Sequence, residues 1–111
     1  MADAAIERWV AAAPLFAALG DETRLRLFGR LVKDGPLSIA ALAAQADVSR
    51  QAVTKHLEVL SSAGLVSGSR VGRETSWSVD GKGLARSTAL LEALSRQWDS
   101  RLERLRTLVE G

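Results

Sequence analysis

The chain has 111 residues, enough for one domain, and its hydrophobic share of 47% is ordinary for a globular fold. It contains no cysteine, which excludes disulfides, thiol chemistry and thiolate metal ligands, and its net charge of +2 is weak evidence for nucleic acid. The uncharged run of residues 9–20 is too short to span a membrane, and the acidic residues before it argue against a secretory signal. We therefore expect a cytoplasmic protein with no membrane partner.

The first predicted helix covers about residues 4–19 and carries Ile6, Trp9 and Val10 at helical spacing. Pro14 should break or kink this helix because proline has no backbone N–H. Gly20 should end it in the left-handed conformation, which glycine adopts without a steric cost.

A second helix is predicted to begin at an Asp21 cap and to run to about Lys33. The sequence Asp34-Gly35-Pro36 should stop it. Its core side is expected to carry Leu25, Phe28, Leu31 and Val32.

The next segment predicts two short helices joined by a tight turn. The first runs from Ser38 to Ala46, and after Asp47-Val48 the second covers about residues 49–63. In the second helix Val53, Leu57 and Leu60 form the stripe expected to be buried, and the opposite side carries Arg50, Gln51, Thr54 and Lys55. An outer face with an amide, a hydroxyl and two cations is typical of a helix that reads the DNA major groove.

The side chains of this reading helix suggest individual roles. Gln51 can pair with adenine, Lys55 can donate to guanine, and Thr54 can contact a base edge or a thymine methyl group. Ser49, at the helix start, can bring its hydroxyl and backbone amide to a phosphate, and Arg50 can contact phosphate or base.

A β-hairpin is predicted over about residues 65–79, with strands 65–70 and 75–79 around a turn at 71–74. Trp77 should pack on the helices, while Arg70 and Arg73 project from the tip. Residues 49–75 hold four Lys or Arg and two Asp or Glu, whereas residues 1–48 hold five Lys or Arg and six Asp or Glu. The excess of positive charge therefore falls on the reading helix and the hairpin. A basic hairpin after a reading helix is typical of a wing that contacts the DNA backbone or minor groove.

The last predicted helix covers about residues 84–109. Leu84, Leu91, Trp98 and Leu105 lie seven residues apart, and Leu94, Leu102 and Val109 lie beside them. We expect this stripe to form a dimer seam with the same helix of a second subunit, flanked by Ile6, Trp9 and Val10. The alternative is an intramolecular core helix that the N-terminal helix partly covers.

Two blocks of sequence resemble a known family. Residues 19–28 are similar to the segment near the start of ArsR-type winged-helix repressors, and residues 48–60 followed by 63–66 are similar to their reading helix and wing entry. The resemblance covers nearly the whole chain. It implies a homodimeric bacterial repressor that leaves its operator when a signal arrives.

The chain departs from many members of that family in its sensing chemistry. Members that sense metals or oxidants use cysteines, or Asp, His and Glu on the last helix, but this chain has no cysteine and one histidine, His56. Glu92, Asp99 and Glu103 of the last helix each have an arginine nearby and are expected to form surface ion pairs. We therefore expect no metal and no cofactor. His56 has either a packing or backbone-contacting role, or a pH-responsive or phosphate-contacting one.

The sequence thus predicts a mainly α fold with a small β-hairpin, a single winged helix-turn-helix domain over residues 1–111 that dimerises through its terminal helices. Its expected function is sequence-specific binding of double-stranded DNA as a transcriptional repressor at a palindromic operator, so we expect it to be nucleoid-associated. The alternative is a winged-helix module that binds proteins and does not read DNA. No glycine-rich phosphate loop or catalytic motif is present, so we expect no enzyme. The operator, the regulated genes, the inducer and any activating role are not specified by the sequence.

Overall fold

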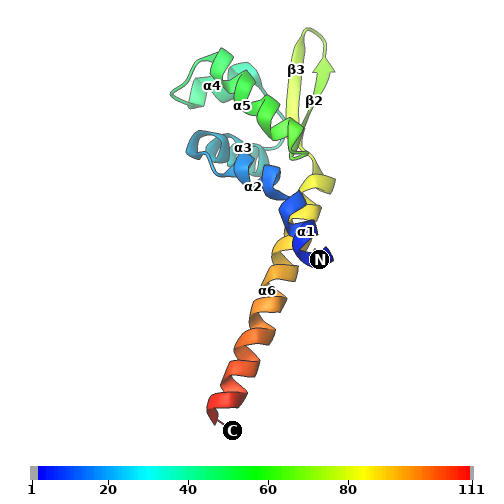
Figure 1. The fold of residues 1–111 in the computed structure, drawn as a ribbon. Helices are drawn as coiled ribbons and strands as arrows, with labels where there is room; N and C mark the ends of the chain where they lie inside the picture. The colour runs from blue at the N-terminus through cyan, green and yellow to red at the C-terminus, as the bar shows by residue number, and fades with distance from the viewer. Residues whose placement is uncertain (1–2, 111) are drawn as a thin grey trace.

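The computed structural model describes residues 3–110, so residues 1, 2 and 111 of the expected domain lie outside the described part. Within it, one end of the molecule holds a helical core with a small sheet, and a long helix runs away from it (Figure 1). The elements in chain order are α1 (Ala4–Ala11), α2 (Ala13–Leu19), α3 (Glu22–Asp34), β1 (Leu37–Ser38), α4 (Ile39–Gln45), α5 (Arg50–Ser62), β2 (Val66–Val71), β3 (Glu74–Val79) and α6 (Gly81–Glu110).

The N-terminal helix is broken, as the proline predicted. α1 and α2 are separated at Ala12, and Pro14 lies in the first turn of α2, where a missing N–H costs no hydrogen bond. The left-handed conformation expected of Gly20 is wrong, because its φ is −78°. The α2 C-terminus is instead capped by Arg24, whose Nε donates to the carbonyl of Ala18 at 2.8 Å.

Helix α3 begins and ends where the sequence predicted. The Asp21 carboxylate accepts from the Arg24 amide at 3.0 Å, and Gly35 ends the helix with a φ of 82°. The predicted core face is half right: Phe28 and Leu31 are buried, but Leu25 and Val32 are 51% and 53% exposed. Leu27 is buried in their place, because the face that packs against α2, α5 and β3 is centred between Leu27 and Leu31.

The helix-turn-helix is formed by α4 and α5, and a serine caps each helix. Ser38 Oγ accepts from the amide of Ala41, and Ser49 Oγ accepts from the amide of Ala52, both at 3.1 Å. The predicted buried stripe of α5 is confirmed, since Val53, Leu57 and Leu60 are fully buried. They join a core cluster with Ala18, Leu27, Phe28, Leu31, Leu42, Leu65 and Val66.

The hairpin is confirmed, with each strand displaced slightly from its predicted bounds. β2 and β3 pair antiparallel from Val66 opposite Val79 to Val71 opposite Glu74, which leaves a two-residue turn. The short strand β1 was not predicted; its Leu37 pairs with Trp77 on the other side of β3. Trp77 packs against the core as expected.

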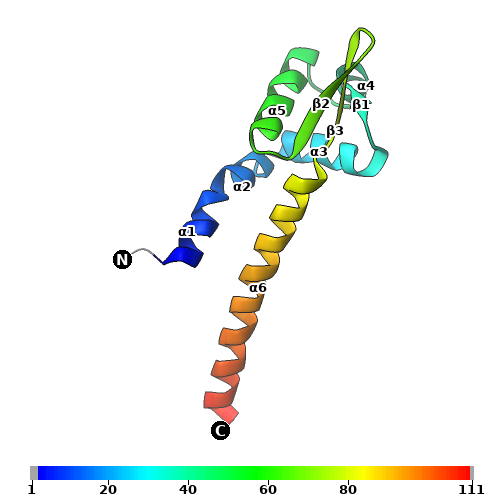
Figure 2. The same cartoon turned by 90° about the vertical axis from the view of Figure 1, so that its right-hand side faces the viewer.

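Helix α6 begins at Gly81, three residues before the predicted start, and Asp80 Oδ1 accepts from the Lys82 amide at 3.0 Å. Leu84 packs against the core of its own chain, so it does not belong to the exposed part of the stripe. Residues 95–110 are all exposed, and Figure 2 shows this half of α6 projecting from the rest of the molecule. No helix among residues 3–110 is both long and apolar enough to cross a membrane.

Candidate nucleic-acid interface

The outer face of α5 presents a small set of polar side chains. Arg50, Gln51 and Lys55 are exposed, while Thr54 is half-buried at the edge of this face. Gln51 and Lys55 lie opposite the buried stripe because they are four residues apart and out of phase with Val53 and Leu57. The core therefore holds α5 with both side chains on its solvent side, where Lys55 also borders a hollow against α2.

Thr54 has less hydrogen-bonding capacity than its hydroxyl alone suggests. Its Oγ1 donates to the carbonyl of Arg50 at 2.9 Å, one turn earlier in the same helix. The hydroxyl proton is thus used within the helix. The γ-methyl group and the oxygen lone pairs remain for a partner, which narrows the contacts of Thr54 to a thymine methyl or a base donor.

The N-terminus of α5 favours an anion. Ser49 uses its oxygen as the cap of the helix, and its hydroxyl proton remains free to be donated. The first-turn amides of Arg50 and Gln51 point out of the helix, and no acidic residue occupies this turn. The positive end of a 13-residue helix therefore faces outward beside the exposed Arg50 side chain.

Glu58 limits the extent of this polar surface. It is exposed and lies seven residues after Gln51, on the same side of α5. A carboxylate there repels phosphates, so the face suited to DNA is confined to the N-terminal half of the helix. This limit was not predicted from the sequence, although the spacing of Glu58 from Gln51 indicates the shared face.

The hairpin tip carries two exposed arginines. Gly72 has a φ of 63° and is the first residue of the two-residue turn, a conformation that favours glycine in tight hairpins. Arg70 Nε donates to the carbonyl of Gly72 at 3.3 Å, which holds this side chain beside the turn, and Arg73 is the other turn residue. Both views show the tip extending beyond α4 and α5, at the end of the molecule opposite the C-terminus (Figures 1 and 2).

His56 lies on the side of α5 that faces the start of α3. It is half-buried, and its charge contributes to the environment of Asp21. The pKa of Asp21 is lowered mainly by the hydrogen bond from the Arg24 amide, and the charges of Arg24 and His56 act in the same direction. This position agrees with the packing role of His56 and places it away from Gln51 and Lys55.

Metal ligands do not gather within the part of the chain that the structure describes. No group of three or more His, Cys, Asp or Glu side chains in residues 3–110 is arranged to hold an ion. Glu103, one of the acidic residues of the last helix, pairs with Arg106 at 3.5 Å, as expected for a surface ion pair.

Comparisons with known proteins agree with this geometry. A family described as "Helix-turn-helix domain" matches residues 19–68. The HTH-type transcriptional regulator Rv2034 of Mycobacterium tuberculosis is 39% identical over 94 residues, which cover 85% of this chain and 84% of that protein. The solved structure of an ArsR-like transcriptional regulator from Rhodococcus sp. RHA1 is 36% identical, covers 92% of this chain and 95% of that one, and superposes with a TM-score of 0.80.

A third protein shares the fold at lower identity. The homodimeric winged helix-turn-helix DNA-binding domain Mb0332 of Mycobacterium bovis is 24% identical, covers 87% of this chain and 89% of that one, and has a TM-score of 0.67.

Proposed function

Because the chain belongs to the ArsR family of winged helix-turn-helix transcriptional regulators, which are DNA-binding proteins and not enzymes, we propose that it is a homodimeric repressor of a palindromic operator. The observation that carries the proposal is the placement of two surfaces at one end of the molecule. The polar N-terminal half of α5 and the basic hairpin tip lie there together, and α6 leaves in the opposite direction (Figure 1).

In the proposed complex, the N-terminal half of α5 enters the major groove. Gln51 reads adenine, Lys55 reads guanine, and the methyl group of Thr54 contacts thymine. Ser49 and Arg50 hold a phosphate at the helix N-terminus. Arg70 and Arg73 of the wing contact the sugar–phosphate backbone, which adds affinity that does not depend on sequence.

A second subunit is proposed because α6 has an apolar stripe that no segment of residues 3–110 covers. Leu91, Trp98 and Leu105 are 53%, 58% and 48% exposed, and Leu102 beside them is also exposed. The radius of gyration is 18.2 Å, whereas a compact chain of this length has about 13 Å. An uncovered stripe of this length is an aggregation hazard for a monomer.

The alternative, a stripe covered by the N-terminal helix of the same chain, finds little support in the packing of α1. Trp9 and Arg8 of α1 border a cleft with Arg96 and Gln97 of α6, which lie on another side of α6 than Trp98. Ile6 and Val10 remain exposed. The proposed seam therefore pairs α6 with α6 of the second subunit, and the exposed Ile6 and Val10 are the side chains of α1 that can flank it.

A two-fold axis along this seam would place the two reading helices on one side of the dimer. Their separation should match one turn of DNA, about 34 Å, so the half-sites should form an inverted repeat. The Mycobacterium bovis domain, which shares this fold, is homodimeric, and this supports a dimer here.

The test is selection of bound fragments from the source genome by the purified protein, followed by footprinting and transcription in vitro. The proposal expects an inverted repeat in the selected fragments and reduced transcription when the protein is added. Fragments without a repeated half-site would contradict the palindromic operator. Increased transcription would contradict the repressor role.

The protein-binding alternative gives a different result with random DNA. A DNA-binding surface must release counterions, so affinity for a random duplex should fall steeply as salt rises. The protein should also be retained on heparin. If affinity for random DNA does not depend on salt and the protein is not retained on heparin, a module that binds proteins would be favoured.

A further inference from the structure

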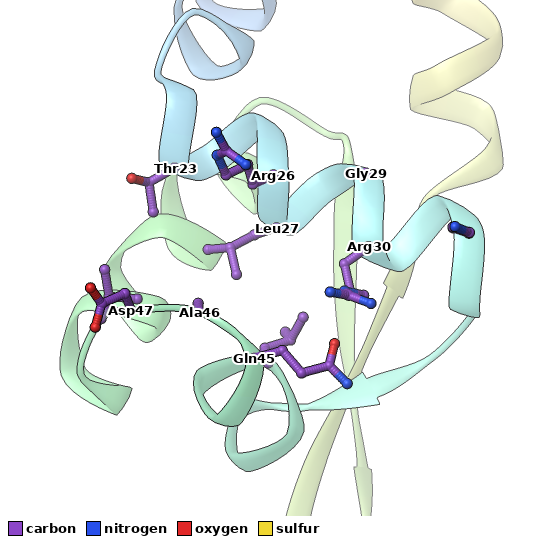
Figure 3. Close-up of a pocket in the computed structure, with 11 residues that line it drawn as sticks. Thr23, Arg26, Leu27, Gly29, Arg30, Gln45, Ala46 and Asp47 are labelled. Carbon is purple, nitrogen blue, oxygen red and sulfur yellow. The ribbon is translucent and has the colours of Figure 1, made fainter.

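A groove of about 630 Å³ lies between α3 and the turn that joins α4 to α5 (Figure 3). Its size is within the range of about 300–1,000 Å³ that small-molecule sites occupy. The DNA interface does not use it, since its walls come from α3, α4 and the turn. The lining residues are Thr23, Arg26, Leu27, Gly29, Arg30, Lys33, Leu42, Gln45, Ala46, Asp47 and Val48.

The groove combines an apolar floor with a cationic wall. Leu27 and Leu42 are buried beneath it, and Ala46 and Val48 extend the apolar surface along the turn. In Figure 3, Leu27 and Arg30 point from α3 toward Gln45 and Ala46. The guanidinium of Arg30 thus lies above the apolar floor, and the side-chain amide of Gln45 lies opposite it.

The charges that line the groove favour an anion. Arg26, Arg30 and Lys33 are on its α3 wall, and Asp47 is the acidic lining residue. Both arginines have partners on α3 outside the groove: Arg26 pairs with Glu22 at 2.7 Å, and Arg30 with Asp34 at 3.2 Å. Exposed pairs within one helix contribute little stability, so Arg30 can exchange Asp34 for a ligand at small cost.

We propose that this groove binds a small organic carboxylate, with its apolar body against Ala46 and Val48, above the buried Leu27 and Leu42, and its carboxylate on Arg30. The guanidinium matches a carboxylate in geometry and charge, and Gln45 can donate a further hydrogen bond. Residues 46–48 of the groove lead directly into the Ser49 cap of α5. A ligand in the groove therefore contacts the turn that sets the start of the reading helix.

The experiment measures binding to the full chain without DNA, so its result does not depend on the proposed operator. The probes are 2-naphthoate and its neutral counterpart 2-naphthamide, compared by isothermal titration calorimetry at the same salt. We expect 2-naphthoate to bind one site per chain, about tenfold more tightly than the amide, because only the carboxylate forms a charge-assisted bond. Equal affinities, or no saturable binding, would overturn the proposal.

Two variants locate the site. Arg30→Gln should abolish the preference for the carboxylate and leave amide binding unchanged, while Lys82→Gln, an exposed change outside the groove, should preserve the preference. A Cβ at Gly29 meets no atom within 4 Å, so the Gly29→Leu variant should fold. Its larger side chain should fill the edge of the groove and lower the affinity for both probes. A preference that survives Arg30→Gln would overturn the assignment.

Amide shifts in NMR spectra give an independent check on position. The signals of Gly29, Gln45 and Ala46 should move during the 2-naphthoate titration. Shifts confined to Arg8 and Arg96 would place the anion in the α1–α6 cleft and contradict the proposal.

Discussion

Gly83 of α6 lies directly against the backbone of Gly64, the residue that follows the Ala63 cap of α5. A Cβ on Gly83 would be 1.7 Å from the carbonyl oxygen of Gly64 and 2.7 Å from its carbonyl carbon. Gly64 itself has a φ of 78° and allows the Leu65 amide to donate to the carbonyl of Leu60 at 3.0 Å. The end of the reading helix and the start of the proposed dimerisation helix are thus in contact through two glycines.

Gly83→Ala should therefore be strongly destabilising. The new methyl group meets backbone, which cannot move without displacing α6 from the core, and we expect a loss of about 3 kcal/mol in the free energy of unfolding. Gly81→Ala is the matched control, because a Cβ there meets nothing within 4 Å. Urea unfolding should show a normal midpoint for the control. Equal midpoints for the two variants would contradict the close contact between Gly83 and Gly64.

Substitutions in the DNA interface should separate sequence reading from backbone contact. Gln51→Ala or Lys55→Ala should cost about 1–3 kcal/mol of operator binding and relax the preference at one base pair. Arg73→Ala should instead weaken all duplexes about equally and lower the slope of log affinity against log salt by about 1. Titrations against the selected operator and its single-base variants distinguish the two outcomes. Wild-type operator affinity in both reading-helix variants would show that α5 is not the reading element.

The pH dependence of stability should reveal the Asp21 cap. In the folded protein the pKa of the Asp21 carboxyl is lowered, chiefly by the hydrogen bond from the Arg24 amide. The charged carboxylate therefore stabilises the fold, and this stability is fully present above the ordinary pKa of 3.8. That stability is lost as the pH falls through the lower, folded pKa. Asp21→Asn keeps a capping side chain without the charge. The wild type should therefore be more stable than Asp21→Asn at neutral pH, and the difference should shrink below pH 3.8. A difference independent of pH would contradict this assignment.

Thiol-binding metals should not release the protein from DNA. The chain has no cysteine and one histidine, so zinc, cadmium or arsenite should leave the operator complex unchanged below the concentrations that precipitate protein. Gel-shift titrations measure this directly. Tight stoichiometric binding of any of the three, with loss of the complex, would contradict the prediction.

The sequence predicted those parts of the fold that short-range chemistry determines. Ser38, Ser49 and Asp21 cap helices because their side chains reach amides of the next turn, and Gly35 ends one because it adopts positive φ. The polar face of α5 follows from the spacing of its residues. These features are set within a few residues of the chain.

The features that were missed depend on contacts between distant segments. β1 has two residues and forms by pairing with β3. Two residues are too few to show the alternation of apolar and polar side chains that predicts a strand. Gly20 needs no left-handed conformation because Arg24, on the next helix, caps α2. Leu25 fits the helical period as well as Leu27 does, and only the positions of α2, α5 and β3 decide which is buried. The groove beside Arg30 arises from three segments and has no sequence motif.

A charge placed in the proposed seam should separate the subunits. Trp98 is 58% exposed in the single chain and lies at the centre of the apolar stripe, so Trp98→Glu would bury an unpaired carboxylate in a dimer while leaving the core of each chain intact. We expect monomers by sedimentation and a loss of operator binding, because the two half-sites then bind separately. Thr107→Glu is the control on the opposite side of α6 and should remain dimeric. A wild-type protein that sediments as a monomer at micromolar concentration, or a dimeric Trp98→Glu variant, would show that this stripe is not the seam.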